Sequence, residues 1–195
     1  MRILTPINKG NVDVRSTMTV TQFVDSEWMP HCQRELSPAT VDHYQKGWKY
    51  LKPYLGQKAL RDVRAADVTD LLASISQNGT GHRCVKQAKT VGSAIFSRAL
   101  AYIINNTNPF KLAALPKRRE KKAAKPVTTV QDVWAMLQAL KGQPKAQAAI
   151  GLTWLGGLNP SEERGALWEN YDGTTLKITQ SVWRTHAGAT KPRGA

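Results

Sequence analysis

The sequence has 195 residues, of which 41% are hydrophobic and 22% charged, a composition typical of a folded globular protein rather than a disordered one. Lysine and arginine total 28 against 14 aspartate and glutamate, so the formal net charge is +14 and indicates a polyanionic partner. Nucleic acid is the first candidate, an anionic membrane surface the second, and a merely solubilising charge the third. No apolar run approaches about 18 residues, so the sequence predicts no membrane span.

Cysteine and histidine usage argues against a metal site. Cys32 and Cys84 stand far apart and outside any Cys-x-x-Cys spacing, so we expect thiols in a reducing compartment and no zinc. The histidines show no metal-ligand spacing, and we expect neither a metal nor a cofactor. The first residues lack the apolar stretch of a signal peptide, which favours a cytoplasmic protein, associated with the nucleoid if it binds DNA.

The N-terminal half predicts helices after a flexible arm at residues 1–17. The first helix carries Val20, Phe23, Val24 and Trp28 on one face. A stronger helix is predicted over residues 38–55, with Ser37 as N-cap and Pro38 as its first residue. Its apolar stripe at 3.6-residue spacing consists of Val41, Tyr44, Trp48, Leu51 and Leu55.

Two further helices are predicted over residues 65–77 and 81–105, the second capped by Thr80, with a short helical turn at 110–115. The stripe of the second helix is rich in small residues, so a neighbouring helix can approach closely. That stripe consists of Val85, Ala88, Gly92, Ile95, Ala99 and Tyr102. Residues 18–115 are therefore expected to form a four-helix bundle.

One face of this bundle is predicted to be basic. Lys46 and Lys49 point away from the stripe of the 38–55 helix. On the 81–105 helix, Arg83, Lys86 and Lys89 lie opposite the apolar stripe, together with His82. Residues 116–126 follow, with six basic residues and one acid between two prolines. This segment is either a solvated linker or a strap along a phosphate backbone, and the two interpretations are compatible.

Residues 127–195 predict a second unit of mixed structure. A helix is expected over residues 128–140, with Val130, Val133, Leu137 and Leu140 inward, and a buried one over 144–155. Alternating apolar residues predict a strand over 175–184, a turn at His186–Gly188 and a returning strand over 189–193. Because a hairpin without further cover is marginal, we expect this unit to be truncated in mid-fold.

The turn from Gly156 to Pro160 separates the 144–155 helix from another helix that extends to about residue 169. Two glycines allow positive φ, and Asn159, Pro160 and Glu162 fit the N-cap, first and third positions of a capping box. A helix N-terminus presents N–H groups and partial positive charge, so the turn is predicted to suit a phosphate.

The order of these pieces resembles the tyrosine recombinases, the phage-integrase family. The resemblance rests on SPATVDHYQKGWKYLKPYLG, LRDVRAADVTDLL and NPF…LPKRRE in the bundle, then on a Gly-Leu turn into a P-S-E helix, W-E-x-Y-D-G and a hairpin ending in lysine. It implies that residues 18–115 are a core-binding, SAM-like domain, that 116–126 are a basic linker, and that 127–195 are the first part of a catalytic domain.

In that family a C-shaped clamp encloses duplex DNA, and a tyrosine forms a 3′-phosphotyrosyl link. Arginines, a lysine and histidines stabilise the phosphoryl transition state, because bidentate guanidinium groups match its oxygens. The resemblance places the first catalytic arginine directly after Gly157-Leu158, where this sequence has Asn159. Arg164 is not expected to replace it, and Glu163, at a usually apolar position, is expected to strain the core. Lys191 matches the hairpin lysine, a general acid.

The H-x-x-R box and the nucleophilic tyrosine of that family are expected after the hairpin, where this sequence ends. We therefore predict a mainly α protein that binds double-stranded DNA in integration and recombination, and whether this chain is an enzyme stays open. The predicted backbone contacts are Lys46, Lys49, Arg83, Lys86, Lys89, Lys117, Arg118, Arg119, Lys121 and Lys122. Three alternatives are kept: part of a split or active recombinase, a non-catalytic regulator that pairs with intact integrase protomers, and an RNA-binding basic protein.

Overall fold

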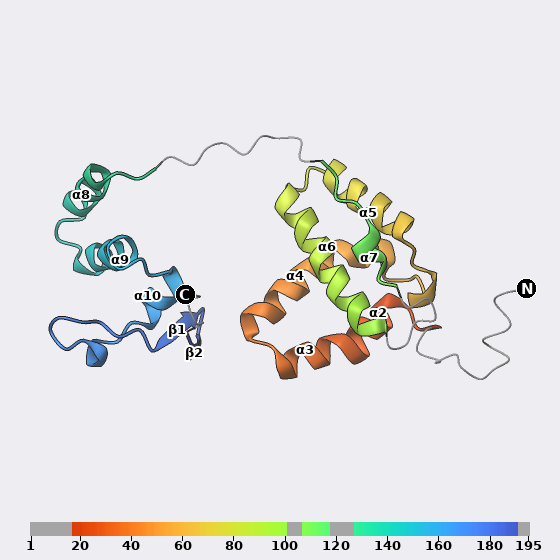
Figure 1. Ribbon diagram of the computed structural model, residues 1–195, viewed down its shortest axis with the longest axis horizontal. Helices are drawn as coiled ribbons and strands as arrows, with labels where there is room; N and C mark the ends of the chain where they lie inside the picture. The colour runs from red at the N-terminus through yellow and green to blue at the C-terminus, as the bar shows by residue number, and fades with distance from the viewer. Residues whose placement is uncertain (1–16, 101–106, 118–126, 191–195) are drawn as a thin grey trace, which may run out of the picture. The chain divides into compact units, whose positions relative to one another are not determined.

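The computed structural model describes residues 17–100, 107–117 and 127–190, and the chain divides into two compact units, Met1–Lys121 and Lys122–Ala195, here unit 1 and unit 2 (Figure 1). The described residues are mainly helical, and their strands form one two-stranded antiparallel hairpin. The expectation of a mainly helical chain with a small β-hairpin is thereby confirmed. No helix within the described ranges is long and apolar enough to cross a membrane.

The first helical run of unit 1 changes from α-helical to π-helical hydrogen bonding in its middle and then returns to an α-helix. It consists of α2 (Val20–Phe23), the π-helical segment η2 (Val24–Trp28) and α3 (Met29–Glu35). Pro30 has no N–H to offer the regular ladder, and the Met29 N–H bonds the Val24 carbonyl five residues back. The predicted apolar face of this run is buried, and Trp28 stacks on Tyr44 with ring centroids 5.1 Å apart.

Helix α4 (Pro38–Leu55) begins and ends where the sequence predicts. Ser37 holds the cap position, but its hydroxyl contacts Thr40 Oγ1 at 3.0 Å and caps no backbone N–H, so that part of the prediction was wrong. The predicted stripe faces the core. Its last three members are buried and its first two are half-buried, packed against the same cluster.

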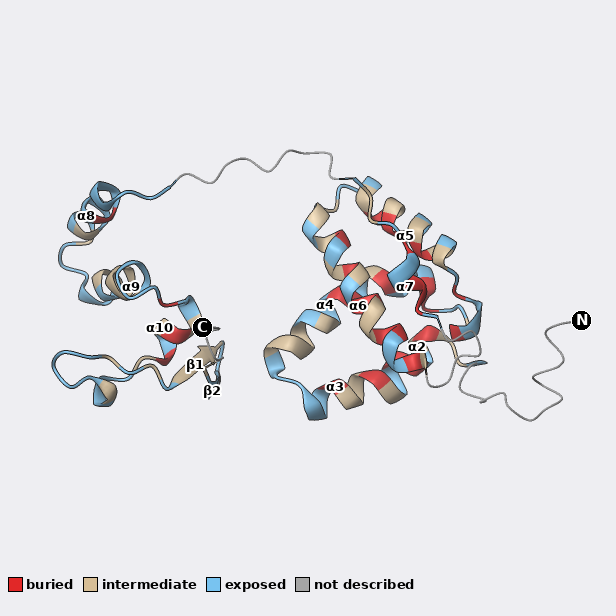
Figure 2. Cartoon of the chain, viewed as in Figure 1, coloured by how far each residue is buried: buried red, intermediate tan, exposed pale blue. Residues whose placement is uncertain are grey.

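The rest of unit 1 comprises the 3₁₀ turn η3 (Leu60–Asp62), α5 (Ala65–Gln77), α6 (His82–Ala99) and α7 (Pro109–Leu112). Helices α4 and α6 pack closely because Gly47 lies against Val91, where a Cβ atom would collide. Gly92 on α6 likewise lies against the Phe110 ring of α7. The predicted close approach along the small-residue stripe is confirmed, and the core of unit 1 lies between these helices (Figure 2).

Two details of α6 differ from the sequence expectation. Gly81, not Thr80, occupies the N-cap position, and no side chain caps the helix start. Residues 101–105, with Tyr102 on the predicted stripe, lie outside the described residues.

Unit 2 is built from α8 (Val130–Ala139), α9 (Pro144–Trp154), α10 (Pro160–Gly165), the 3₁₀ turn η5 (Trp168–Asn170), β1 (Gln180–Trp183) and β2 (His186–Ala189). Thr129 and Asp132 form a capping box at the start of α8. Val133 is buried as predicted, but Val130 is 54% exposed and α9 buries no residue, so the expectation of a buried 144–155 helix was wrong. These helices lack a covering layer within the described part of unit 2.

The β-hairpin is shorter than predicted and turns earlier. Strand β1 covers only four residues, and the chain reverses at Arg184–Thr185 rather than at His186–Gly188. His186 is therefore a strand residue paired with Trp183, and Gly188 pairs with Ser181. Arg184 adopts a φ of 54°, the left-handed conformation that a two-residue hairpin turn requires at its start.

Candidate nucleic-acid interface

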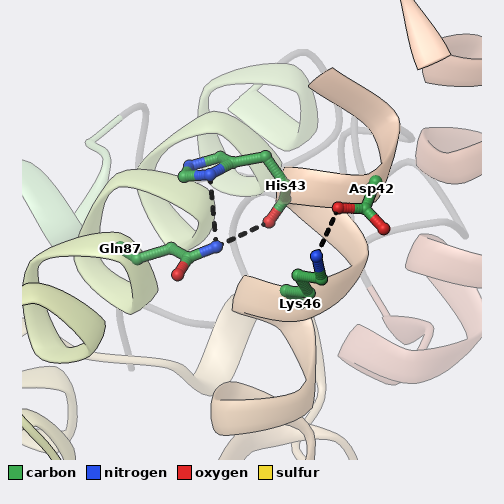
Figure 3. Close-up of polar contacts among 4 residues, drawn as sticks. All are labelled: Asp42, His43, Lys46 and Gln87. Atoms are coloured by element: carbon green, nitrogen blue, oxygen red, sulfur yellow. Dashed lines mark hydrogen bonds and ion pairs between the residues drawn. The ribbon is translucent and has the colours of Figure 1, made fainter. Parts of the chain in front are cut away.

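The predicted basic face of unit 1 lies on two helices that are fixed to each other by polar contacts. Gln87 of α6 donates through Nε2 to the His43 carbonyl of α4 at 2.9 Å and lies 3.2 Å from His43 Nδ1 (Figure 3). Lys46 is one turn beyond His43, and Arg83 is one turn before Gln87, so both cations flank this contact. The α4–α6 contact thus fixes the relative position of two helix segments that carry cations.

Exposure supports access to these cations. Lys46 and Lys49 on α4 and Arg83 and Lys86 on α6 are all exposed. Lys46 forms an ion pair with Asp42, with Nζ 2.6 Å from Oδ2 (Figure 3). The Lys46 side chain is 55% exposed, so this pair contributes little and can exchange for a phosphate.

Lys89 differs from the other four. Its Nζ donates to the Ala113 carbonyl at 2.6 Å, and the residue is half-buried. This bond joins α6 to the segment that follows α7, so Lys89 is a structural tie in the described protein. Its predicted phosphate contact would require that bond to open. Lys117 is exposed, whereas Arg118, Arg119, Lys121 and Lys122 lie outside the described residues.

The Gly156–Pro160 turn of unit 2 forms a self-contained cap. Gly157 has a φ of 62°, but Gly156 is needed for a different reason, since a Cβ there would meet the Leu152 carbonyl. Asn159 Oδ1 accepts from the N–H groups of Ser161 and Glu162, each at 3.0 Å. Glu162 Oε2 in turn accepts from the Asn159 N–H at 3.0 Å, which completes the predicted capping box.

This geometry overturns the prediction that the turn presents free N–H groups to a phosphate. Asn159 Oδ1 already accepts from the N–H groups of the first turn. Glu162, with 7% relative exposure, places a buried carboxylate at the same helix start. A bound anion would have to displace a side chain that already satisfies these groups. Asn159 is therefore a structural cap in this protein, which is a role that arginine cannot fill.

The neighbours of Asn159 clarify two other expectations. Arg164 is exposed, and its Nε donates to the Pro160 carbonyl at 2.9 Å, so the guanidinium folds back over the first turn of α10. Glu163 is half-buried and accepts a hydrogen bond from Thr153 Oγ1 at 2.9 Å. The expected core strain at Glu163 was wrong, because its carboxylate has a partner on α9. Lys191 lies outside the described residues.

Other ionisable groups have local roles. Burial raises the pKa of the Cys32 thiol, and a hydrogen bond with Cys84 raises the pKa of Tyr50. Lys58, with Nζ 2.8 Å from Oδ1, lowers the pKa of Asp67, helped by the Arg64 N–H. Within the described ranges, histidine, cysteine and acidic side chains form no group that could hold a metal ion.

Sequence reasoning missed two features of unit 2. The first is an apolar groove of about 840 Å³ lined mainly by α9 and by residues between Glu163 and Tyr171, with Leu155 76% and Trp168 86% exposed. The second is a stack of Trp183, Arg184 and His186 at the tip of the hairpin. The sequence could not have indicated the groove, because the apolar residues of the 144–155 helix are the ones that a buried helix would also have.

Neither a protein-family model nor a curated protein matches this sequence. Solved structures do match its fold. A lambda integrase dimer bound to a COC' core site matches with a TM-score of 0.69 at 18% identity, covering 97% of this chain and 52% of that one. The Tn1549 transposon integrase in complex with circular intermediate DNA matches with a TM-score of 0.70 at 19% identity, covering 88% and 59%.

A lambda integrase tetramer bound to a Holliday junction also matches, with a TM-score of 0.68 at 15% identity, covering 95% of this chain and 54% of that one. The chain therefore has an integrase-like fold, and the resemblance to tyrosine recombinases predicted from the sequence is confirmed at the level of fold. The chain spans between 52% and 59% of the length of these three structures.

Proposed function

We propose that this chain is a duplex DNA-binding protein of the tyrosine recombinase type, which acts in DNA integration and site-specific recombination in the cytoplasm, at the nucleoid, without cleaving DNA by itself. The observation that carries the proposal is the integrase-like fold, which extends over 97% of the chain in its match to a DNA-bound integrase. The net charge of +14 supports the same partner, because a polyanion offsets it directly.

Unit 1 supplies the principal DNA-binding surface in this proposal. The exposed cations Lys46, Lys49, Arg83 and Lys86 lie on two helices held together by the His43–Gln87 contact. Lysine and arginine at fixed spacing bind backbone phosphates and position the protein without reading bases. The segment from Lys117 to Lys122 adds further phosphate contacts. Lys89 contributes mainly through its bond to Ala113.

The absence of cleavage rests on Asn159. A phosphoryl transition state needs positive, preorganised donors, and the loss of one such donor costs about 10²–10³ in rate. The Asn159 side chain is neutral, and its oxygen is committed to the N–H groups of Ser161 and Glu162. In this proposal Lys191 contacts DNA but has no arginine at position 159 to act with.

A salt titration tests DNA binding. Binding of the full chain to a labelled duplex, followed by fluorescence anisotropy, should weaken steeply with salt, with a log–log slope of about −0.9 per phosphate contact. The variant R83A/K86A should flatten that slope by about 2 units. Its matched control is R61A/K111A, which removes the same charge from exposed positions on η3 and α7. A salt-independent affinity, or equal effects of both variants, would contradict the proposal.

A nicked suicide duplex tests the absence of cleavage, because it traps a covalent protein–DNA link. We expect no covalent product from this chain alone. Competition between duplex DNA and RNA of equal length distinguishes the proposed partner from RNA, and the duplex should compete better. A covalent band would show that the chain is a recombinase in its own right.

The apolar groove of unit 2 favours one second candidate, a split recombinase. Leu155 and Trp168 are exposed beside a groove that has no cover within the described residues. In this second candidate, a second polypeptide that carries the H-x-x-R box and the tyrosine covers the groove and supplies those groups, and Asn159 slows the reaction by about 10²–10³ without abolishing it. Mixing this chain with such an integrase C-terminal half on the suicide duplex should then give a covalent product. Footprinting with an intact integrase would instead detect a regulator that shares its site.

A further inference from the structure

The tip of the unit 2 hairpin holds three side chains in a stack. Trp183 ends β1, Arg184 opens the turn and His186 begins β2. The Arg184 guanidinium carbon lies 4.6 Å from the Trp183 ring centroid, within the range of a cation–π interaction. The His186 ring is stacked against Trp183, with centroids 6.2 Å apart and an interplanar angle of 17°. The Trp183 ring therefore favours one placement of the Arg184 guanidinium.

The base of the hairpin is anchored, whereas its tip is open. Strand β1 packs on α10, and Gly165 approaches Gln180 so closely that a Cβ there would collide with the Gln180 carbonyl. Helix α10 is fixed in turn by the Asn159 capping box. At the other end, Arg184 and His186 are exposed and Trp183 is half-buried. The hairpin thus presents a positioned guanidinium on a supported strand pair.

The stretch of sequence that contains this tip carries charges of one sign. From residue 173 to residue 195 the sequence contains four lysine or arginine residues and no aspartate or glutamate. The cations are Lys177, Arg184, Lys191 and Arg193. A guanidinium beside an indole ring keeps its planar fork of N–H donors, and that fork matches the geometry of a phosphate.

We propose that the Trp183–Arg184–His186 tip is a second DNA contact, in which Arg184 binds a backbone phosphate of duplex DNA while Trp183 holds its guanidinium in place. This inference rests on the proposed function, because it assumes that the chain binds duplex DNA. It adds a contact in unit 2 that is independent of the lysines and arginine of α4 and α6. Arg184 supplies the charge, and Trp183 is a positioning residue.

The test compares variants of the full chain on one labelled duplex across a salt series. R184A should bind about tenfold more weakly, the size of one lost charge-assisted hydrogen bond, and its log–log salt slope should flatten by about 0.9. K177A is the matched control, since it removes one exposed cation from the same acid-free segment away from the tip, and it should bind within about twofold of wild type. R184K should keep the slope but bind less tightly than wild type, because lysine lacks the planar fork.

W183F provides a separate measure of positioning. It keeps an aromatic face and every charge, so the salt slope should stay unchanged while affinity falls less than in R184A. Equal effects of R184A and K177A, with wild-type binding intact, would overturn the tip contact and leave the proposed function standing. Tighter binding to an acidic peptide than to the duplex would also overturn it. If wild type fails to bind duplex DNA at all, both proposals fall.

Discussion

The two units of this chain are stabilised in different ways. Among the described residues, unit 1 buries 22 apolar or cysteine side chains in one cluster, whereas unit 2 buries only two apolar residues, Val133 and Leu158. Unit 1 therefore has a core of its own, made by helices that pack on one another (Figure 2). A unit with so little apolar burial depends on local hydrogen bonds or on cover from elsewhere.

Unit 2 contains several hydrogen-bonded motifs formed by residues close together in the sequence. Capping boxes start α8 and α10, and the Asp172 carboxylate accepts from the N–H groups of Thr174 and Thr175 at 2.9 and 2.7 Å. Each of these motifs joins residues three or fewer positions apart. They define the shape of short segments but do not tie distant segments together. The comparison teaches that unit 1 can present a fixed DNA-binding surface, while unit 2 orients a few groups locally.

The largest expected effect is in the core of unit 1. Phe110 is fully buried against Phe96 and Gly92, so Phe110→Ala should lower the free energy of unfolding by about 3–5 kcal/mol. Leu155→Ala, at a residue 76% exposed in unit 2, should change it by less than about 0.5 kcal/mol. Urea denaturation followed by circular dichroism measures both. Similar losses for the two variants would show that Leu155 is buried in solution and that unit 2 is covered.

Two glycine-to-alanine substitutions, one in each unit, should change the free energy of unfolding in opposite directions. Gly92→Ala places a methyl group against the Phe110 ring and should destabilise unit 1 by about 1–3 kcal/mol. Gly151 lies within α9 with no atom near the position of a Cβ, so Gly151→Ala should stabilise the helix by about 0.5–1 kcal/mol. Thermal unfolding of the two variants against wild type is the measurement. A loss at Gly151 would indicate that another segment packs on α9.

The same contrast explains which features were predictable from the sequence. Local signals succeeded in both units: Pro38 at the start of α4, the bounds of α5 and the Asn159–Glu162 capping box all follow from neighbouring residues. The hairpin register failed because Gly188 suggested a turn, whereas Arg184 adopts positive φ without being glycine. No local rule favours that choice.

In the candidate site, too, local features could be predicted from the sequence and contacts between distant residues could not. The helical positions of Lys46, Lys49, Arg83 and Lys86 could be predicted, because periodicity alone separates the basic face from the apolar stripe. The bond from Lys89 to the Ala113 carbonyl could not, since it depends on where the chain passes after α7. The prediction that Asn159 caps α10 was correct. That this cap occupies the N–H groups a phosphate would need became clear only from the distances of Asn159 to those groups.

Asn159 offers the next test, confined to unit 2. Asn159→Ala removes the acceptor for the Ser161 and Glu162 N–H groups and should destabilise α10 by about 1 kcal/mol. Asn159→Ser, which can cap, should be close to wild type. Asn159→Arg should lose the cap like alanine, because an arginine side chain has no hydrogen-bond acceptor. Amide hydrogen exchange at Ser161 and Glu162 reports the cap, and unchanged exchange in the alanine variant would contradict its structural role.

The smallest effect concerns two carboxylates whose pKa values are both lowered, one in each unit. In unit 1 the Asp67 pKa is lowered first by Lys58, nine residues away, and in unit 2 the Asp132 pKa is lowered by the N–H and hydroxyl of Thr129. A carboxylate with a lowered folded-state pKa stabilises the fold above its unfolded pKa of about 3.9 and loses this as pH falls through the folded value.

Only the Asp67 bond joins separate elements, so only Asp67→Asn should alter global unfolding, and by less than about 1 kcal/mol because the Lys58 and Asp67 side chains are 44% and 31% exposed. The deficit of Asp67→Asn relative to wild type should be constant at neutral pH and shrink below about pH 4. Asp132→Asn should leave the urea midpoint of unit 1 unchanged at every pH. A deficit that grows on acidification would show that the Lys58–Asp67 pair does not stabilise the folded bundle.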